Sequence, residues 1–347
     1  MLPKTWSVGS KPVNPQGDRP FATRRKRPFW LLFWLALLVV LWWSFREIPP
    51  REVWATLGSL QLDSVLILVS LNAAILLLFS SRWWLILRTQ GYARSYISLV
   101  GYRLAGFGIT YFTPGPQLGG EPLQVYLLHR RQGVPSTTAV ASVTLDKMLE
   151  LLANFTFLLG GVATIMAAGL FPRPSSLALL FVPLGLLALP ISYLIALWNG
   201  RLPFTRMFAR FSLAFPRSSW LPQAQAIALS AESQIAQFCK DHPWALVQAL
   251  FLSFMIWAAL ILEFGLALHF LGLRLALPQI IVLLTAARLA FLLPIPAGLG
   301  TLEAGQVLAT QALGLNPVVG ISLSLLIRAR DIGLGALGLW WGGVLSR

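Results

Sequence analysis

The stretch PGPQLGGEPLQVYLL at residues 114–128 is apolar enough to enter a lipid bilayer, yet proline and glycine break it. A second stretch, PAGLGTLEAGQ at residues 296–306, repeats this design. Proline and glycine release backbone N–H and C=O groups from helical hydrogen bonds, and a membrane tolerates such groups only inside protein or beside a wet cavity. In each stretch a glutamate, Glu121 or Glu303, opens a short helix, where the helix dipole favours a carboxylate. The two stretches therefore predict a pair of short re-entrant or broken helices.

The composition places these stretches in a membrane protein. The chain has 347 residues, of which 56% are hydrophobic and 11% are charged, and its mean hydropathy is +0.71. An ordinary soluble domain carries about 25% charged residues, so this chain could not cover a globule with polar surface. We therefore exclude a soluble enzyme, a nucleic-acid-binding protein and a disordered protein. The class that remains is an all-α, polytopic transmembrane helix bundle.

Around the broken stretches we expect about eight long spans, each near the roughly 20 residues that cross a bilayer. The first follows Pro28 and a basic segment, but it is rich in tryptophan and no small-residue cleavage site follows it, so we interpret it as a retained span and not a signal peptide. The second ends in Arg82, Trp83 and Trp84, a pattern typical of a membrane interface. The expected spans cover about residues 29–45, 62–87, 96–113, 137–170, 176–198, 244–271, 278–295 and 317–345.

Basic residues are concentrated in two polar segments. Residues 1–27 contain seven lysines and arginines against one aspartate, and so supply +6 of the net charge of +15. We interpret them as a disordered basic cytoplasmic tail, which either contacts anionic lipid or only sets the topology. Residues 199–243 form a polar connector with an amphipathic stretch near 222–240, and we expect a connector helix on the membrane surface. Residues 28–347 then form a single multi-pass domain in the cell (inner) membrane.

An offset of 182 residues relates two parts of this domain. The polar, proline and glycine matches keep one register over about 50 residues, which indicates a duplication with repeat cores at about residues 96–170 and 278–345. The matched pairs include Pro114 and Pro296, Glu121 and Glu303, Gln124 and Gln306, Pro135 and Pro317, and Ser142 and Ser324.

The relative orientation of the two copies depends on whether the short pieces cross the membrane. If they do not, the copies are parallel and the basic connector lies outside. If each acts as a crossing, the copies are inverted and the basic segments share the inside. The positive-inside rule favours inversion, although the segment lengths argue against it. Inverted repeats with paired interrupted helices are common in secondary transporters, where the interruptions mark the binding site.

Half of the twelve acidic residues lie in apolar or broken segments. A charge at mid-bilayer costs several kcal/mol on insertion scales, so it is rarely there without a partner or a function. Asp146 and Glu150 are four residues apart on one helix face, and Arg328 and Asp331 share a face of the corresponding helix. These six acids are Glu121, Asp146, Glu150, Glu263, Glu303 and Asp331, and the nearby bases are Arg103, Lys147, Arg288, Arg328 and Arg330.

Two interpretations of these charges stay open. They can form a binding site, or they can be structural, with a capping glutamate in each copy and an ion-pair network between helices. Glu263 can likewise relay protons or make an interhelical hydrogen bond. No catalytic pattern accompanies them, since Cys239 is the single cysteine and the three histidines lack metal-ligand spacing. We therefore expect no enzyme, no catalytic residue, no metal and no cofactor.

Three runs of sequence resemble a known family. They are TPGPQLGGEPLQVYLLHRRQGVPSTTAVASVTLDKMLE at residues 113–150, LLPIPAGLGTLEAGQ at 292–306 and SLSLLIRARD at 322–331. Together they resemble the lysylphosphatidylglycerol synthetase-type transmembrane region, the flippase-like family of integral membrane proteins, over roughly residues 25–345. The resemblance implies a polytopic inner-membrane protein that handles a lipid or a lipid-linked substrate. Two-domain members add a cytosolic synthase domain, which we do not expect because this chain ends just after its last span.

The resemblance also implies positions of interest. One departure is Gln124, because the family often has arginine three residues after the first glutamate, and this weakens the case for a Glu–Arg grip on phosphate there. The family's acidic and glycine positions correspond to Gly120, Glu121, Asp146, Lys147, Glu150, Gly298, Gly300 and Glu303.

We hypothesise that the protein translocates a lipid whose headgroup follows a polar path between the two broken hairpins. Basic residues would attract the lipid phosphate, and acidic residues would face an amine or relay protons. The expected partners are membrane lipids, namely an anionic or aminoacylated phospholipid or a polyprenyl-linked substrate, and no nucleic acid. The alternatives are an ion-coupled small-solute transporter and a membrane partner protein that does not transport. The expected substrate-binding residues are Arg103, Pro114, Gly115, Gly119, Gly120, Glu121, Gln124, Asp146, Lys147, Glu150, Arg288, Pro296, Gly298, Gly300, Glu303, Arg328 and Asp331.

Overall fold

The structure, a computed structural model, is all-helical within the residues it describes, as the composition predicts. Eleven α-helices and one 3₁₀ turn account for its regular elements, and these residues contain no strand. The expected tail at 1–27 and first span at 29–45 lie outside the described residues. The described ranges are 60–113, 119–169, 173–215, 220–293 and 295–346.

Within the described residues, four helices are long and apolar enough to span a membrane, namely α3, α6, α10 and the part of α7 from Leu179 to Trp198. α13 is also 30 residues long, but Arg328, Arg330 and Asp331 interrupt its apolar run. The helices are α3 (Leu62–Thr89), α4 (Tyr96–Phe112), α5 (Glu121–Gln132), α6 (Ser136–Ala167), α7 (Arg173–Trp198), α8 (Pro203–Ala214), α9 (Leu221–Asp241), α10 (Pro243–Phe270), α11 (Leu277–Leu292), α12 (Thr301–Ala312) and α13 (Pro317–Ser346), with the 3₁₀ turn η1 at Pro296–Gly298.

Two segments expected as spans, 96–113 and 278–295, are the first arms of hairpins. α4 has 17 residues and α11 has 16, so each is about 25 Å long and shorter than the roughly 30 Å of hydrocarbon in a bilayer. α4 packs against α5, and α11 packs against α12. Each pair therefore turns back on itself, as the proline and glycine residues between the arms predict.

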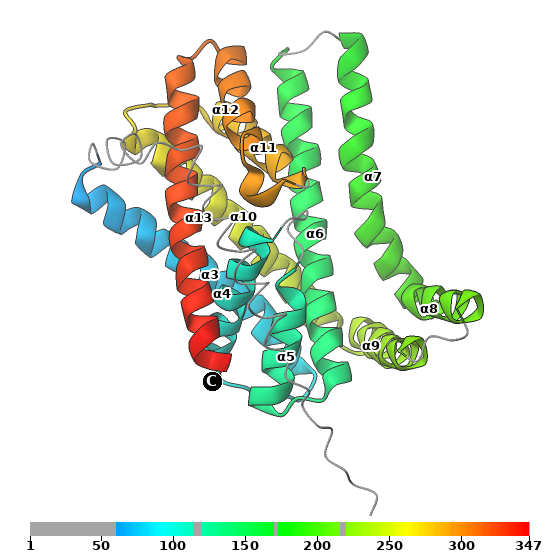
Figure 1. The fold of residues 1–347 in the computed structure, drawn as a ribbon. Coiled ribbons are helices and arrows are strands. Elements are labelled where there is room, and N and C mark those ends of the chain that lie inside the picture. Colours follow the sequence, from blue (N-terminus) through cyan, green and yellow to red (C-terminus); the bar gives the residue numbers. More distant parts are fainter. Residues whose placement is uncertain (1–59, 114–118, 170–172, 216–219, 294, 347) are drawn as a thin grey trace, which may run out of the picture.

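The two hairpins belong to the repeat predicted at an offset of 182 residues. Shifted by 182, the starts of α4, α5 and α6 at 96, 121 and 136 become 278, 303 and 318, whereas α11, α12 and α13 start at 277, 301 and 317. In Figure 1, α6 runs from the lower end of the bundle to the upper end, and α13 runs from the upper end to the lower. Likewise α5 ends at the lower end and α12 at the upper end. The two copies are therefore inverted.

Glycine lets the two copies interlock. α4 packs against α13, and α11 packs against α6, so each hairpin lies against the last helix of the other copy. A Cβ added to Gly338 of α13 would overlap the carbonyl oxygen of Leu104 on α4, and one added to Gly161 of α6 would overlap the hydroxyl of Thr285 on α11. Small residues at such contacts allow helix backbones to approach closely, which matters in lipid because no hydrophobic force joins the helices there.

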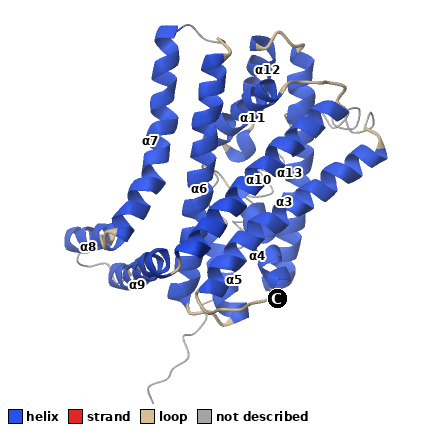
Figure 2. Ribbon diagram, turned by 180° about the vertical axis from the view of Figure 1, so that it is seen from behind, coloured by secondary structure: helices blue, strands red, loops and turns tan. Residues whose placement is uncertain are grey.

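The polar connector folds into two helices rather than one. α8 and α9 pack against each other across the lower part of the bundle (Figures 1 and 2). The amphipathic stretch expected near 222–240 is α9, but protein covers its apolar face, because Ile235, Phe238 and Cys239 are buried in a cluster with residues of α6 and α7. α8 has no buried residue. It is therefore α8 whose apolar side chains remain at the surface.

Because the α4–α13 contact has no room for a side chain, we expect Gly338→Ala to destabilise the bundle by about 1–3 kcal/mol, the usual cost of overpacking. The melting temperature of the purified protein in detergent measures this effect. Gly333→Ala on the same helix is the matched control, since a Cβ there meets no atom of the described residues within 4 Å, and it should keep or slightly raise the melting temperature. Equal melting temperatures for the two variants would contradict the close approach of α4 and α13.

Candidate functional site

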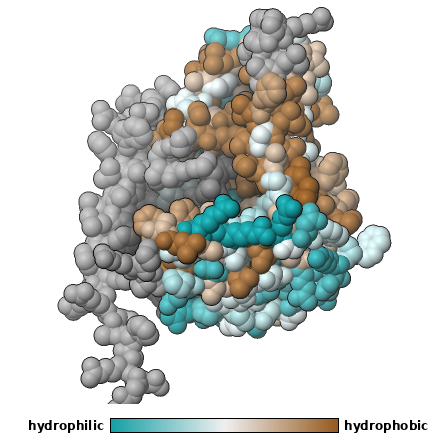
Figure 3. Space-filling view, turned by 90° about the vertical axis from the view of Figure 1, so that its right-hand side faces the viewer, coloured by the Kyte–Doolittle hydropathy of each residue, from teal (hydrophilic) through white to brown (hydrophobic). Residues whose placement is uncertain are grey.

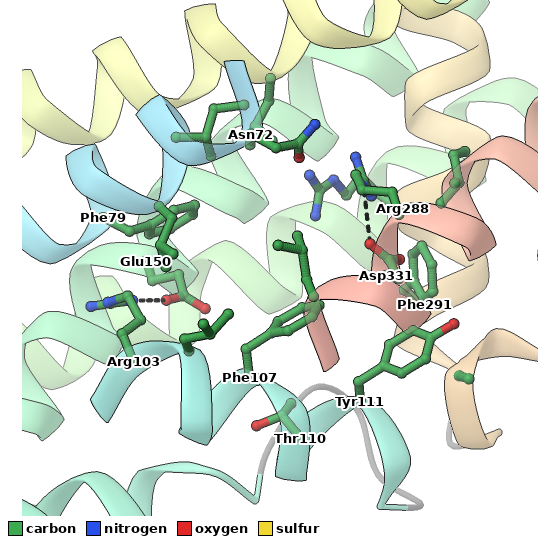
Figure 4. A pocket seen from close by; sticks show the side chains of 18 of the residues that line it. Asn72, Phe79, Arg103, Phe107, Thr110, Tyr111, Glu150, Arg288, Phe291 and Asp331 are labelled. Carbon is green, nitrogen blue, oxygen red and sulfur yellow. Dashed lines mark hydrogen bonds and ion pairs between the residues drawn. The ribbon is translucent and has the colours of Figure 1, made fainter. Parts of the chain in front are cut away.

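A cavity of about 270 Å³ lies where the two hairpins meet. Its wall is drawn from α3, α4, α5, α6, α10, α11 and α13 and from residues 295–298. Figure 4 shows side chains of both repeat copies around it, with Arg103 and Glu150 on one side and Arg288 and Asp331 on the other. The aromatic lining is Phe79, Phe107, Tyr111, Phe264 and Phe291, and the charged lining is Arg103, Glu121, Asp146, Lys147, Glu150, Glu263, Arg288, Arg330 and Asp331.

Asp146 on α6 is the centre of the first charged cluster. Its Oδ1 accepts a hydrogen bond from Arg82 Nε of α3 at 2.7 Å, and its Oδ2 accepts one from Arg103 Nη2 of α4. Arg82 Nη1 also donates to Ser253 Oγ of α10 at 3.0 Å. The Arg82 side chain is only 1% exposed. The sequence pattern predicted a residue at the membrane interface, but Arg82 is instead a buried link among α3, α6 and α10.

Lys147 joins the first hairpin to α6. Its Nζ lies 3.0 Å from Glu121 Oε1 at the start of α5 and 2.8 Å from Glu150 Oε1. The backbone N–H of Gly119 donates to the other oxygen of Glu121 at 2.9 Å. Gly120 in turn lies against the backbone of Gly106 so closely that a Cβ would overlap it. Glu121 thus closes the hairpin while its side chain, 24% exposed, still lines the cavity.

In the second copy, Arg328 holds the hairpin closed through Glu303 and the η1 turn. Glu303 at the start of α12 accepts hydrogen bonds from Nε and Nη2 of Arg328 on α13. The same guanidinium donates to the carbonyl oxygens of Ala297 at 3.1 Å and Gly298 at 3.2 Å. Ala297, Gly298 and Gly300 all have positive φ, so this turn is tight and Arg328 occupies its inside. Neither Glu303 nor Arg328 lines the cavity.

A third cluster joins α13 to α10 and α3. Arg330 Nη1 lies 2.8 Å from both carboxylate oxygens of Glu263, and Arg330 Nε donates to Asp331 Oδ1 at 2.8 Å. Asn72 Nδ2 of α3 donates to Glu263 Oε1 at 3.2 Å. Glu263 was expected either to relay protons or to make an interhelical hydrogen bond, and these contacts are interhelical hydrogen bonds.

Arg288 of α11 differs from the other bases around the cavity. Its guanidinium lies 5.0 Å from the centre of the Trp257 ring and makes no ion pair within 4.0 Å among the described residues. A cation over an aromatic face keeps its N–H groups available for other partners. Figure 4 shows Arg288 beside the cavity.

The cavity brings together about half of the expected site residues. Those that line it are Arg103, Glu121, Gln124, Asp146, Lys147, Glu150, Arg288, Gly298 and Asp331. Those beside it, in the hairpin turns or in the Glu303–Arg328 ion pair, are Gly119, Gly120, Gly300, Glu303 and Arg328. Pro296 begins the 3₁₀ turn η1, and Pro114 and Gly115 lie outside the described residues.

The expected set of substrate-binding residues omitted Asn72, Arg82 and Ser253 of these clusters, and also Glu263 and Arg330, which the sequence had shown only as charges in apolar segments. Arg82 could have been found by the cost argument alone, because it is a charge within a helix of apolar residues. Among the described residues, no group of three or more histidine, cysteine, aspartate or glutamate side chains could hold a metal ion.

Comparisons with known proteins give one consistent result. A family model described as the lysylphosphatidylglycerol synthase TM region matches residues 30–338. A UPF0104 membrane protein of Methanocaldococcus jannaschii is 25% identical over 77% of this chain and 80% of its own length. A UPF0104 membrane protein of Methanothermobacter thermautotrophicus is 24% identical over 81% of this chain and 85% of its own length. Another, of Pyrococcus horikoshii, is 22% identical over 89% of this chain and 92% of its own length.

Because Asp146 neutralises two buried arginines, we expect Asp146→Ala to destabilise the protein by about 3–5 kcal/mol, the usual cost of leaving buried charges without their partner. Denaturant unfolding of the protein in detergent, followed by tryptophan fluorescence, measures the loss. Asp241→Ala at the exposed end of α9 is the control, and its effect should stay within about 0.5 kcal/mol. A small loss in Asp146→Ala would mean that Arg82 and Arg103 do not depend on this carboxylate.

Proposed function

Since the chain belongs to the lysylphosphatidylglycerol synthase TM region family, we propose that it translocates a phospholipid or a lipid-linked substrate between the two leaflets of a membrane. The observation that carries this proposal is the charged cavity between two inverted re-entrant hairpins. In transporters with inverted repeats, substrates bind where the interrupted helices meet, and the two repeats move against each other around that site.

The size and lining of the cavity support a lipid headgroup as the bound part. The cavity of about 270 Å³ lies just below the range of about 300–1,000 Å³ that is usual for pockets of drug-sized ligands, a size that suits a headgroup alone, with the acyl chains in the surrounding lipid. Apolar residues such as Leu76, Leu104, Phe264 and Leu334 share the wall with the charged groups. An amphipathic wall of this kind suits a substrate with a polar head and an apolar tail.

Arg288 is the side chain best placed to bind a lipid phosphate. Five bases and five acids surround the cavity, counting Arg82, which binds Asp146 from behind. Most of these bases are held by carboxylates, so a phosphate bound to them would displace an existing ion pair. Arg288 carries its charge without such a pair among the described residues, so a phosphate can bind it with no pair to break.

Glu121 and Lys147 are the groups best placed to respond to the headgroup. Both line the cavity, and their ion pair at 3.0 Å links the start of α5 to α6. An amine of the substrate can compete for Glu121, and a phosphate can compete for Lys147. The second hairpin is held differently, because the Arg328 guanidinium donates four hydrogen bonds to Glu303 and the η1 turn. We therefore assign the movement that accompanies transport to α5, the second arm of the first hairpin, since Arg103 holds α4 to Asp146 of α6.

The basic residues support an orientation in the membrane. Arg130 and Arg131 at the end of α5, and Arg206 and Arg210 of α8, lie toward the lower end of the bundle in Figure 1. By the positive-inside rule this end is the cytoplasmic one. Because α3 runs from the upper part of the bundle toward this end (Figures 1 and 2), one further span at 29–45 would also place the basic tail at 1–27 in the cytoplasm. We propose the cell membrane as the location.

We expect Glu121→Gln and Arg288→Gln each to slow transbilayer movement of a labelled anionic phospholipid in proteoliposomes by about tenfold or more. The reason is that a hydrogen bond to a charged group contributes about 1.5–3 kcal/mol, and each tenfold change corresponds to about 1.4 kcal/mol. The controls are Asp63→Asn and Arg274→Gln, which change exposed charges outside the cavity and should leave the rate unchanged.

Monodisperse elution and an unchanged melting temperature must accompany each variant, so that a lost rate is not a lost fold. Wild-type rates in both Glu121→Gln and Arg288→Gln would contradict the assignment of the cavity as the lipid-binding site. Uptake of a small solute that requires a proton gradient, with no movement of labelled lipid, would instead favour the ion-coupled transporter.

A further inference from the structure

α8 carries an apolar face that the rest of the described protein does not cover. Phe204, Met207 and Phe211 are spaced three and four residues apart, so they lie on one side of the helix. They are 39%, 39% and 47% exposed, and no residue of α8 is buried. Phe215, directly after the helix, continues the row and is 62% exposed. Four large apolar side chains in one exposed row are unusual unless another phase or molecule covers them.

The opposite side of α8 is basic. At about 100° per residue, Arg206 lies roughly opposite Phe204, and Arg210 lies about 100° round the helix from Phe211; both arginines are exposed. Arg201 lies just before the helix and is exposed as well. The helix sequence PFTRMFARFSLA contains no acidic residue. An apolar face backed by arginines is the pattern of a helix that lies in a membrane interface.

A buried carboxylate fixes the direction of this helix. Glu232 of α9 is 2% exposed and accepts hydrogen bonds from the backbone N–H groups of Phe204 and Thr205, each at 2.9 Å, and from the Thr205 hydroxyl at 2.7 Å. It therefore satisfies the free N–H groups at the start of α8. Since α9 is itself packed on α6 and α7, α8 is held on the bundle with its apolar face outward.

The surroundings of α8 match a lipid interface. α8 lies across the direction of α7 at the basic end of the bundle (Figure 1). Trp198 at the end of α7 and Trp220 before α9 flank it, and they are 51% and 61% exposed. Tryptophan is enriched at the level of lipid headgroups. Figure 3 shows the same face, with hydrophobic surface in its upper part and hydrophilic surface gathered in its lower part.

We propose that α8 lies in the leaflet at the basic end of the bundle and binds anionic phospholipid. Phe204, Met207 and Phe211 enter the boundary between headgroups and acyl chains. Arg206 and Arg210 bind the phosphates of the same leaflet. A net negative leaflet attracts each such arginine by about 1 kcal/mol, which is about fivefold in affinity, and a zwitterionic leaflet, whose phosphates are balanced by ammonium groups, lacks this attraction. This surface is separate from the cavity, so it does not depend on the proposed translocation.

Site-directed spin labelling of the full chain tests the position of the helix. Cys239 is the single cysteine, so Cys239→Ala gives a background for single labels. A label at Phe211→Cys should be accessible to oxygen and protected from an aqueous nickel reagent in vesicles of phosphatidylcholine and phosphatidylglycerol at about 3:1. A label at Leu213→Cys, on the basic side and 85% exposed, should show the reverse. Equal nickel accessibility at the two sites would overturn the membrane position.

Retention of phosphatidylglycerol tests the lipid class. Native mass spectrometry of the purified chain should show that Arg206→Gln with Arg210→Gln lowers bound phosphatidylglycerol by about fivefold for each arginine removed. Arg274→Gln, an exposed arginine outside the connector, is the matched control and should retain the wild-type amount. Unchanged retention in the double variant would overturn anionic lipid binding. Cross-linking of Phe211→Cys to a second protein in lipid-free detergent would overturn the lipid position, because it would show that a protein partner covers this face.

Discussion

The ion pairs of the Asp146 carboxylate with two buried arginines are the interaction on which the rest of the structure depends. Two arginines from two other helices converge on it, Arg82 from α3 and Arg103 from α4. Taking charged groups out of water costs several kcal/mol for each ion, and mutual attraction offsets this cost only when the hydrogen-bond geometry is close to ideal. The helices α3, α4 and α6 therefore have little freedom in how they cross. Arg82 extends the constraint to α10 through Ser253, and the cavity lies beside this polar centre.

The inverted repeat is symmetric in its helices and asymmetric in its chemistry. Both copies begin the second arm of the hairpin with a glutamate bound by a cation of the following long helix. In the first copy that cation is Lys147, a single amine shared between two carboxylates at the cavity wall. In the second copy it is Arg328, whose planar guanidinium also holds the η1 turn. A guanidinium with several directed bonds fixes a geometry more firmly than an amine does. The corresponding glutamates, Glu121 and Glu303, thus make a movable contact in one copy and a rigid one in the other.

The two helices of the polar connector, α8 and α9, differ in what covers their apolar faces. Protein covers the apolar face of α9, while the apolar face of α8 remains outward. Glu232 connects the two helices by capping the start of α8. The outer side of α6 packs against α9, and its inner side carries Asp146 and Lys147. The surface helix and the cavity wall are therefore attached to the same element from opposite sides.

Local sequence patterns were sufficient for the class of fold and for its duplication. The scarcity of charge predicted a membrane bundle, and the glutamates with their proline and glycine neighbours predicted two broken hairpins at an offset of 182 residues, near which α5 and α12 begin. These features depend on composition and on neighbours along the chain, so sequence alone determined them. The sequence did not place Arg82 inside the protein or distinguish α8 from α9, because an amphipathic pattern does not say whether protein or lipid covers its apolar face. It also aligned Asp146 with Arg328, although the cation that binds Glu121 is Lys147, one position further on. Only the tertiary structure decided these partners, since an ion pair depends on how helices distant in the chain cross and on which side chains meet there.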